Sequence, residues 1–378
     1  MLNRYLGQSG LLVSRICLGT MTFGMKDWGC DQKTANAIVR HFIDQGGQFI
    51  DTADMYSAGL SEEMLGNALK NHHREDLVVA SKCWFRTGEG ANDKGLSRKH
   101  IFDAVEKSLK RLKMDYLDLY QVHGPDWFTP MEETMSALDD LVRQGKIRYI
   151  GCSNYYAWQI VKANSIAEKH GKEKFISAQH LYNLVRRDIE NEILPACADQ
   201  GLGMLCWSPL AGGFLSGKYG RDQELPEGSR ISFRKNIDVP RYFSDQAFDV
   251  IDELKTISTE IGKTPSQISL AWLLFDRRVT SVIIGPKNVK QLKDTLEVAD
   301  WNLEQKFHQR LETKLELPSG YPMEWVELGF GNISEKRNSN RITIVFLYKE
   351  TKIRFHNQPP FFCLTSRHRK AKDHRDFS

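Results

Sequence analysis

Apolar segments rich in Ile, Val and Leu recur along the chain, and each is followed by polar residues and then by a stretch of helical periodicity. Eight of these segments predict strands, at residues 14–20, 47–52, 77–82, 116–123, 147–154, 175–180, 203–209 and 280–286. Amphipathic helices are predicted between them, at residues 31–46, 61–71, 97–114, 134–146, 156–171 and 188–201. Several of these stretches begin with Ser, Thr or Asp and end in Gly, as capped helices do.

The alternation of eight strands with helices predicts an α/β protein of the (β/α)8, or TIM-barrel, class. A doubly wound open sheet is the alternative, but LGTMTFG after the first strand lacks the G-x-G-x-x-G turn typical of that fold. Residues 4–15 predict an N-terminal β-hairpin about Gly10, placed to plug the bottom of the barrel. An insertion is expected near residues 220–243, and an extra helix at residues 264–276.

The strand–helix alternation stops near residue 330, which suggests a boundary between a barrel domain at 1–330 and an extension at 331–378. The extension holds 11 Lys/Arg and 4 Asp/Glu, while the whole chain carries a net charge of +4, so residues 1–330 are mildly acidic. We expect this basic extension to be weakly ordered. Its basic cluster lacks interleaved aromatic repeats, so no nucleic-acid partner is predicted.

The remaining composition indicates a cytoplasmic protein with no membrane partner. No apolar run reaches the roughly 18 residues that a membrane span requires, and Arg4 and Gly7 interrupt the N-terminus where a secretory signal would be apolar. The seven cysteines are scattered without a Cys-x-x-Cys pair, and no His-Glu-x-x-His motif is present. Reduced thiols and no metal site are therefore expected.

Reactive side chains gather at the predicted strand ends, which is where barrels of this class carry their chemistry. The second strand ends at Asp51 with Tyr56 just beyond it, the third ends at Lys82 and the fourth at His123. Each residue alone is more often structural, but four titratable residues on three consecutive strands indicate one catalytic site. The following strand ends contribute Ser153, Asn154 and Gln179.

These four residue types together suggest general acid catalysis on a carbonyl group. A phenol with a pKa of about 10 is a weak acid at pH 7, so we expect the Lys82 ammonium to lower the pKa of Tyr56. Asp51 would keep Lys82 charged, and His123 would orient a carbonyl oxygen. Asp54, in the same stretch, is expected to be only a turn or helix-capping residue.

No side chain donates hydride, so a bound cofactor is expected to supply the electrons. The glycine-containing segment WSPLAGGFLSGKY after the seventh strand and GPKNVKQLKDTL after the eighth occupy the usual phosphate-binding loops of such barrels. Lys218 would bind a pyrophosphate, Lys287 a ribose 2′-phosphate, and Trp207 would stack on the nicotinamide. A nucleotide-hydrolase P-loop is excluded because Tyr219 replaces the Ser or Thr that binds magnesium.

Eight segments of this chain, between residue 4 and about residue 300, carry a family resemblance: YLGQSGLLVSRICLGTMTFG, FIDTADMYSAGLSEEMLG, Ser81-Lys82, DLYQVHGPD, IGCSNY, YNLVRR, WSPLAGGFLSGKY and IIGPKNVKQL. The chain resembles the aldo-keto reductases, in the branch that includes potassium-channel β subunits and microbial oxidoreductases. The resemblance implies a (β/α)8 barrel that binds NADPH, with NADH less favoured, and a catalytic tetrad of Asp51, Tyr56, Lys82 and His123.

The resemblance also implies a set of binding residues. Those for the cofactor are Gly19, Thr20, Met21, Asp51, Ser153, Asn154, Gln179, Trp207, Ser208, Pro209, Leu210, Gly212, Leu215, Gly217, Lys218, Gly285, Lys287 and Gln291. The walls for a small carbonyl substrate are Phe23, Trp84 and Phe85. An NADPH-dependent carbonyl reductase is the favoured interpretation, and a nicotinamide-binding regulatory subunit with little turnover is the alternative. The oligomeric state stays open.

Overall fold

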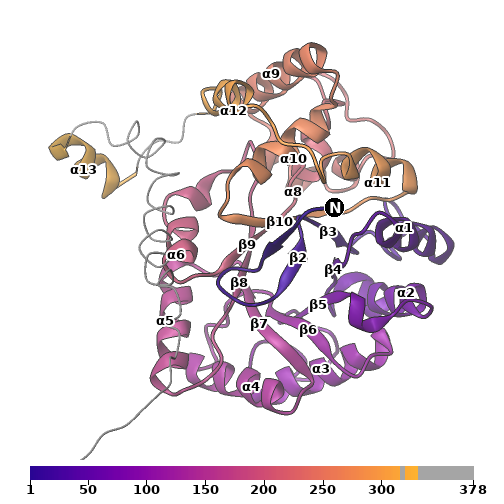
Figure 1. Ribbon diagram of the computed structural model, residues 1–378, viewed down its shortest axis with the longest axis vertical. Helices are drawn as coiled ribbons and strands as arrows, with labels where there is room; N and C mark the ends of the chain where they lie inside the picture. The colour runs from indigo at the N-terminus through magenta and orange to yellow at the C-terminus, as the bar shows by residue number, and fades with distance from the viewer. Residues whose placement is uncertain (316–319, 331–378) are drawn as a thin grey trace, which may run out of the picture. The chain divides into compact units, whose positions relative to one another are not determined.

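A closed barrel of eight parallel strands forms the centre of the computed structural model, which describes residues 1–315 and 320–330 (Figure 1). The strands pair around the barrel in the order β10-β3-β4-β5-β6-β7-β8-β9. They are β3 (Ile16–Gly19), β4 (Phe49–Asp51), β5 (Val78–Cys83), β6 (Leu117–Val122), β7 (Ile147–Ser153), β8 (Ser177–Leu181), β9 (Gly203–Trp207) and β10 (Val279–Ile284). All eight predicted strands are present, so the barrel prediction is confirmed.

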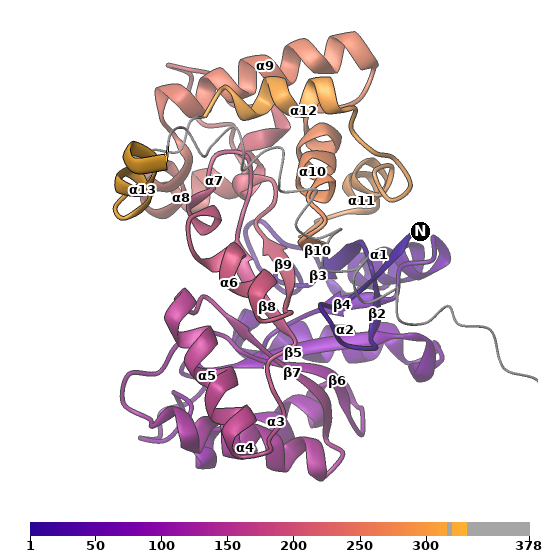
Figure 2. The ribbon, with the colours of Figure 1, turned by 60° about the vertical axis from the view of Figure 1, so that its left-hand side comes forward.

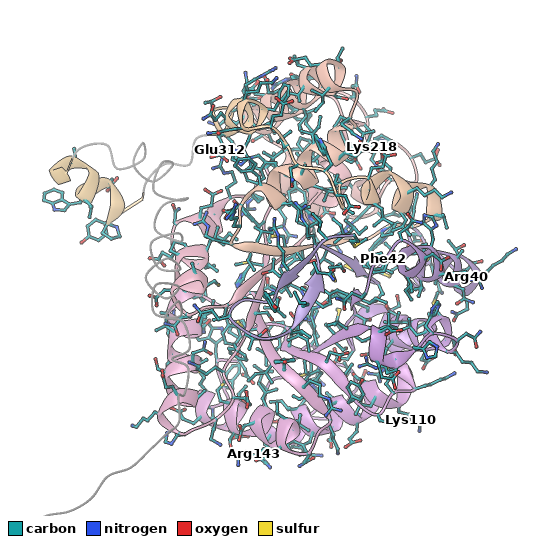
Figure 3. All side chains as sticks on the ribbon, viewed as in Figure 1. Arg40, Phe42, Lys110, Arg143, Lys218 and Glu312 are labelled. Carbon is teal, nitrogen blue, oxygen red and sulfur yellow. The ribbon has the colours of Figure 1, made fainter. Side chains whose placement is uncertain are left out.

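Helices form a ring outside the strands (Figures 1 and 2). They are α1 (Gln32–Asp44), α2 (Leu60–Leu69), α3 (Arg98–Leu112), α4 (Met131–Arg143), α5 (Ala157–Lys169), α6 (Ile193–Asp199), α10 (Pro265–Phe275) and α11 (Val289–Leu296). Their amphipathic pattern fixes which face is buried. In Figure 3, Arg40, Lys110 and Arg143 point outward, whereas Phe42 of α1 is fully buried.

Further helices lie between the last two strands and after the barrel. They are α7 (Arg230–Phe233), α8 (Lys235–Tyr242), α9 (Asp245–Ile261) and α12 (Gln305–Glu312). The predicted insertion at 220–243 contains α7 and α8, whereas α9 and α12 were not predicted. None of the helices in the described ranges combines the length and apolar character needed to cross a membrane.

The chain divides into two compact units, Met1–Leu317 and Pro318–Ser378. The barrel lies in the first unit. The described part of the second contains helix α13 (Met323–Phe330). The basic extension predicted at 331–378 lies outside the described residues.

The predicted N-terminal hairpin consists of the antiparallel strands β1 (Asn3–Tyr5) and β2 (Leu12–Ser14). The guanidinium of Arg4 donates hydrogen bonds to the carbonyl oxygens of Leu274, at 2.7 Å, and of Val279. The hairpin is thereby tied to the last turn of α10 and to the first residue of β10. Its side chains pack into the barrel in a cluster that we call the apolar floor: Leu6, Val13, Cys17, Phe49, Val78, Ala80, Leu119, Leu205 and Ile283.

The barrel interior changes from apolar to polar along the strands. Side chains two residues apart on a strand point to the same side, so each residue of the apolar floor shares its direction with the residue two positions later. Three strands place a polar side chain there: Phe49 precedes Asp51, Ala80 precedes Lys82, and Leu119 precedes Gln121. A polar layer therefore lies above the apolar floor, toward the carboxyl ends of the strands.

Candidate active site

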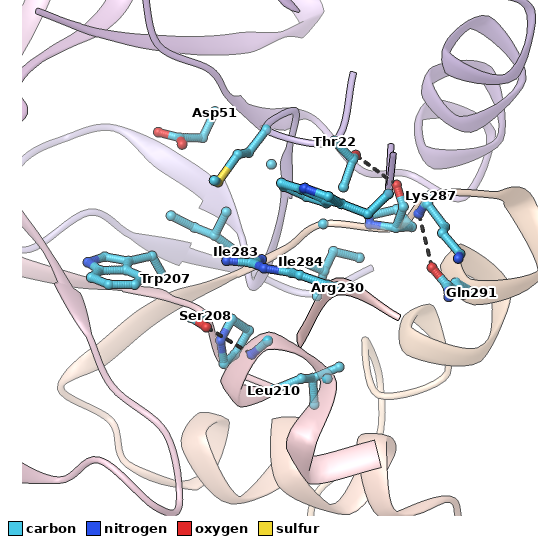
Figure 4. A pocket seen from close by; sticks show the side chains of 18 of the residues that line it. Thr22, Asp51, Trp207, Ser208, Leu210, Arg230, Ile283, Ile284, Lys287 and Gln291 are labelled. Carbon is cyan, nitrogen blue, oxygen red and sulfur yellow. Dashed lines mark hydrogen bonds between the residues drawn. The ribbon is translucent and has the colours of Figure 1, made fainter. Parts of the chain in front are cut away.

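A cavity of about 630 Å³ opens at the carboxyl ends of the strands. Its walls come from the ends of β3, β4, β6, β7, β8, β9 and β10, and from the segment between β9 and α9. In the view of Figure 4, Asp51 and Trp207 lie toward one end of the pocket and Lys287 and Gln291 toward the other, with Arg230 between them. This size is typical of a small-molecule site.

Three of the four predicted catalytic residues are in direct contact at one end of this cavity. The ammonium of Lys82 donates to Oδ2 of Asp51 at 2.5 Å and to the carbonyl oxygen of Thr52 at 2.8 Å. The same nitrogen lies 3.4 Å from the hydroxyl of Tyr56. Lys82 is completely buried beneath Tyr56, and Asp51 and Tyr56 line the pocket.

Local backbone geometry turns Tyr56 back over the barrel. Tyr56 begins a short 3-10 turn, Tyr56–Gly59, just after β4. Ser57 and Ala58 in that turn have left-handed φ angles of 49° and 54°, which are unusual for residues other than glycine. The hydroxyl of Ser57 donates to the carbonyl oxygen of Phe23 at 2.9 Å, which holds the turn in place. The strained turn therefore brings the phenol to Lys82.

His123 completes the set of four. Its ring packs edge-on against Tyr56, with ring centres 5.9 Å apart, and against Phe85 at 5.0 Å. Its backbone amide donates to the carbonyl oxygen of Cys83 at 2.9 Å, which fixes the end of β6 next to β5. The imidazole lines the pocket. The structure thus brings together all four side chains that were predicted from separate strand ends.

Burial and charge set the protonation of this group. Burial is the largest single effect on the pKa of Lys82 and lowers it, but the charge and hydrogen bond of Asp51, together with Tyr56, outweigh burial, so the pKa ends above its ordinary value. Burial, together with the Lys82 charge, lowers the pKa of His123 well below its ordinary value. At neutral pH Lys82 is therefore an ammonium ion and His123 a neutral imidazole.

The pKa of Tyr56 differs from the expectation. Burial raises it, and the opposing effect of the Lys82 charge is too small to bring it below the ordinary value. The predicted net lowering of the pKa is therefore wrong for the chain alone, because the cost of burying a phenolate exceeds the gain from the ammonium. Tyr56 is consequently a phenol, the form that can donate a proton.

Two glutamine side chains hold the other oxygen of Asp51. Nε2 of Gln179 donates to Oδ1 of Asp51 at 2.9 Å, and Nε2 of Gln121 donates to the same oxygen at 3.0 Å. Nε2 of Gln179 also lies 3.2 Å from Oε1 of Gln121. Gln179 was predicted as a cofactor ligand, whereas Gln121 was not singled out, because a polar residue inside a strand gives no signal of its partners.

The predicted residues after β7 form a connected row along the pocket. The hydroxyl of Ser153 donates to the carbonyl oxygen of Gln179 at 2.8 Å. Nδ2 of Asn154 donates to the carbonyl oxygen of His123 at 2.9 Å, and its Oδ1 accepts from Nε1 of Trp207 at 3.1 Å. Ser153, Asn154, Gln179 and Trp207 all line the cavity.

The segment after β9 is shaped for close approach to a ligand. Ala211, Gly212 and Gly213 are three successive residues with left-handed φ angles of 50°, 67° and 96°. Successive residues of this kind can direct backbone N–H groups toward an anion. The hydroxyl of Ser208 accepts a hydrogen bond from the Gly212 amide at 3.1 Å (Figure 4). The glycines are required here because a side chain would strain this backbone.

Lys218 and Lys287 line the same cavity, and neither forms an ion pair within the described part of the chain. Burial lowers the pKa of Lys218, and the charge of Lys287 lowers it further. Two ammonium groups that repel each other in one cavity suit an anionic ligand. Oε1 of Gln291 accepts from the Lys287 amide at 3.0 Å, which closes the turn between β10 and α11.

Most of the predicted cofactor residues line the pocket, but three do not. Thr20 is buried and its hydroxyl lies 2.9 Å from that of Ser61. Leu215 is buried in the hydrophobic core, and Gly217 faces Pro265. The remaining predicted positions do line it: Gly19, Met21, Asp51, Ser153, Asn154, Gln179, Trp207, Ser208, Pro209, Leu210, Gly212, Lys218, Gly285, Lys287 and Gln291.

Of the predicted substrate walls, only Phe85 lines the cavity. Phe23 is fully buried in the core, because the chain turns inward after β3. Trp84 packs over Gly124, and its indole N–H donates to the carbonyl oxygen of Pro125 at 3.0 Å. The structure therefore does not place Phe23 or Trp84 where a ligand of this pocket would contact them.

Other lining residues were not predicted. The insertion contributes Arg230, Arg234 and Arg241, and the loop after β3 contributes Trp28. Arg230 and Arg234 share the buried Asp238, at 3.8 and 3.2 Å, and the Arg230 guanidinium lies 5.1 Å from the centre of the Trp28 ring. Arginines in a segment of irregular pattern give no sequence signal that they face a pocket.

Comparisons with known proteins agree with this geometry. The sequence model of the aldo/keto reductase family matches residues 15–316. YrpG, an uncharacterized oxidoreductase of Bacillus subtilis (strain 168), is 39% identical over 326 residues, which cover 84% of this chain and 96% of that protein. A probable voltage-gated potassium channel subunit beta of Oryza sativa subsp. japonica is 39% identical over 301 residues, covering 78% and 90%.

A third relative is named for a reaction. Versiconal hemiacetal acetate reductase of Aspergillus parasiticus is 37% identical over 291 residues, which cover 71% of this chain and 84% of that protein. The family match covers the barrel almost completely and includes every residue of the pocket. The chain belongs to the aldo/keto reductase family.

Proposed function

We propose that this protein is an oxidoreductase that reduces the carbonyl group of aldehydes or ketones to an alcohol, with NADPH as the hydride donor and Tyr56 as the general acid. The observation that carries the proposal is the contact of Tyr56, Lys82 and Asp51 at the edge of the cavity. In this arrangement the phenol can donate a proton, the ammonium can stabilise the resulting phenolate, and the carboxylate can keep the ammonium charged. Membership of the family and the names of the relatives support carbonyl reduction in general.

The cavity fits a nicotinamide dinucleotide on features of the chain itself. Both hydrogen-bonded partners of the Gln179 amide are reached through Nε2, so its Oε1 is left to accept from a carboxamide. The left-handed residues 211–213 and Lys218 provide donors for a pyrophosphate. A Cβ on Gly19 would lie 2.7 Å from the Ile283 side chain, so β3 and β10 pack closely at this wall of the pocket and leave no room for a side chain on Gly19.

Within the bound complex, the residues of the chain have distinct roles. NADPH would supply the hydride that no side chain can donate. Tyr56 donates its phenolic proton to the carbonyl oxygen, and His123, which is neutral, hydrogen-bonds the same oxygen. Lys82 stabilises the phenolate that remains, and Asp51 keeps Lys82 charged.

The preference for NADPH over NADH follows from the charge at the far end of the pocket. Lys218 and Lys287 repel each other, and a ribose 2′-phosphate would relieve that repulsion. NADH keeps the pyrophosphate near Lys218 but lacks the 2′-phosphate, so it would leave the Lys287 ammonium without an anion. We therefore propose that Lys287 contacts the 2′-phosphate.

The test of this function follows NADPH oxidation with a panel of aldehydes, in the wild type and in Tyr56→Phe. Loss of the phenolic proton should lower kcat by roughly 10² to 10⁴-fold, while the Kd for NADPH stays within about twofold. Stopped-flow kinetics separate the alternative, because a regulatory subunit would give at most a slow single turnover. Full activity of Tyr56→Phe would contradict the role of the phenol, and loss of NADPH binding would show that Tyr56 is structural.

A further inference from the structure

Gln121 is a buried polar residue in the polar layer of the barrel, and it does not line the pocket. It lies on β6 with no exposed surface, and in the strand register it pairs with Lys82 on one side and Gly151 on the other. The residues that do line the pocket nearby are Asp51 and Gln179. Gln121 therefore acts on a ligand only through those two side chains.

The chemistry of the neighbouring groups fixes how the Gln121 amide is oriented. The Asp51 carboxylate that pairs with Lys82 can only accept hydrogen bonds, so the amide nitrogen of Gln121 must face it, at 3.0 Å. The amide oxygen of Gln121 then faces the Gln179 nitrogen at 3.2 Å. One N–H of Gln179 is thus directed to Asp51 and the other to Gln121, which fixes the Gln179 amide plane.

The barrel makes room for this side chain by means of a glycine. A Cβ added to Gly151 would lie 3.3 Å from Cγ of Gln121 and 2.3 Å from the hydroxyl oxygen of Ser177. Any larger residue at this position of β7 would push Gln121 away from Asp51. Because β7 leaves this space next to β6, Gln121 can extend across the barrel interior to β4.

We propose that Gln121 is a positioning residue that couples two parts of the site, the proton-donating group around Asp51 and the carboxamide-binding residue Gln179. It holds the Asp51 carboxylate toward Lys82, and it holds the Gln179 amide with its oxygen toward the nicotinamide carboxamide. This inference rests on the proposed function for its ligand. Each of these two parts has its own measurable effect. Loosening Asp51 lowers the rate of proton donation, and loosening Gln179 lowers recognition of the carboxamide N–H.

The first experiment uses Gln121→Met, which keeps the size of the side chain and removes both hydrogen bonds. The probes are NADP⁺ and its 3-acetylpyridine analogue, in which a methyl group replaces the carboxamide NH₂. By tryptophan fluorescence quenching, the wild type should bind NADP⁺ roughly fivefold more tightly than the analogue, the value of one neutral hydrogen bond. In the variant this preference should fall toward one, and kcat with NADPH should fall roughly 10- to 100-fold.

Tyr120→Phe is the matched control, because it removes one polar group from the adjacent position of the same buried strand, outside the Asp51 network. It should keep both the preference and kcat within about twofold of the wild type. If Gln121→Met keeps the wild-type preference and kcat, the proposal is wrong. If its kcat falls but the preference is unchanged, Gln121 does not couple the two parts and the proposal is also wrong.

A second variant guards against misfolding of the first. Gln121→Glu has the same shape, but its carboxylate would repel Asp51 unless it carries a proton, which it could then donate to Oδ1. Its kcat relative to the wild type should therefore rise as the pH falls, and a pH-independent ratio would contradict the proposal. A wild type that binds neither nucleotide would overturn the proposed function, whereas equal binding of both nucleotides by an active wild type would overturn this inference alone.

Discussion

Asp54 is an acidic side chain that the fold buries beside the catalytic group. It follows Asp51 by three residues, yet its side chain is only 2% exposed, and helix α2 begins after Gly59 instead. Asp54 does lie in the turn after β4, as one of its two expected roles requires, but it caps neither the 3-10 turn nor α2, whose N-caps are Met55 and Gly59. Burial, together with the negative charge of Glu62, raises the pKa of Asp54 to about 8. At neutral pH this residue is largely protonated in the folded chain.

Asp54→Asn should consequently stabilise the protein at neutral pH. The folded chain binds a proton at Asp54 between about pH 3.8 and 8, and the unfolded chain does not, so stability is lost as the pH rises through that window. The amide has no proton to lose, and the variant should gain up to about 4 kcal/mol at pH 7 but almost nothing at pH 4. Urea unfolding of both proteins at the two pH values measures the difference. A gain that does not depend on pH would refute the raised pKa.

Sequence reasoning predicted that the four side chains of the tetrad would meet, but it did not find the residues that hold them, and individual residues show why. Asp51, Tyr56, Lys82 and His123 end strands or follow them, so the barrel geometry alone brings them to one edge. Gln121 occupies the same next-to-last strand position as Lys82, but an uncharged glutamine does not suggest chemistry, and its contacts depend on Asp51 across the barrel and on space left by Gly151. Such contacts join residues far apart in the sequence and leave no local pattern.

At the scale of elements, the turn from β10 into α11 carries Lys287, the residue that we propose to decide the cofactor preference. Asn288 caps α11, because its side-chain oxygen accepts a hydrogen bond from the backbone N–H of Gln291 at 2.9 Å. The side-chain oxygen of Gln291 in turn accepts from the backbone N–H of Lys287. These bonds fix the backbone of the turn without using the Lys287 ammonium. The ammonium is exposed at the mouth of the pocket and available to an anion.

Lys287→Met should therefore weaken NADPH binding roughly tenfold and leave NADH binding unchanged, because only NADPH carries the 2′-phosphate. Lys290→Met is the control, since Lys290 is exposed on α11, three residues after Lys287, but does not line the pocket. Kd values for the two cofactors come from fluorescence titration. If the variant binds NADPH and NADH more weakly by the same factor, Lys287 does not contact the 2′-phosphate.

One unassigned element, helix α9, was predictable in principle from its own pattern. Helix α9 buries Ala247, Val250, Ile251, Leu254 and Ile257, a spacing that is typical of an amphipathic helix. It stands between the seventh and eighth strands, where one helix, α10, already completes the unit. The fold class thus predicts how many strand–helix units are present. It does not predict additional helices such as α9, which belong to a long insertion.

At the scale of the whole molecule, buried histidines make the stability of the folded chain depend on pH. Burial lowers the pKa of His180 to about 4, and burial is also the main reason that the pKa values of His100, His123 and His308 are lowered. The unfolded chain binds protons at these residues below about pH 6.5 more readily than the folded chain does. Stability should fall as the pH drops from about 6.5 toward 4.

His180 alone should contribute about 2 kcal/mol to this loss at pH 5, because its pKa is about 4 in the folded chain and 6.5 in the unfolded one. His180→Gln removes that titration and should lose less stability than the wild type between pH 7.5 and pH 5. Urea midpoints at both pH values provide the comparison. An identical loss of stability in both proteins would mean that His180 binds a proton in the folded chain as readily as in the unfolded chain.

The apolar floor has a consequence for how the site communicates with its surroundings. It lies one inward-facing position, roughly 6.6 Å, below the polar layer, and the N-terminal hairpin covers it from the other side. Within the described part of the chain, Asp51 therefore faces the cavity at the mouth of the barrel and is closed off from the opposite end by the floor and the hairpin. A ligand in that cavity would lower the dielectric constant around the ion pair of Asp51 and Lys82, so ligand binding itself would strengthen the charge interactions on which the proposed proton donation depends.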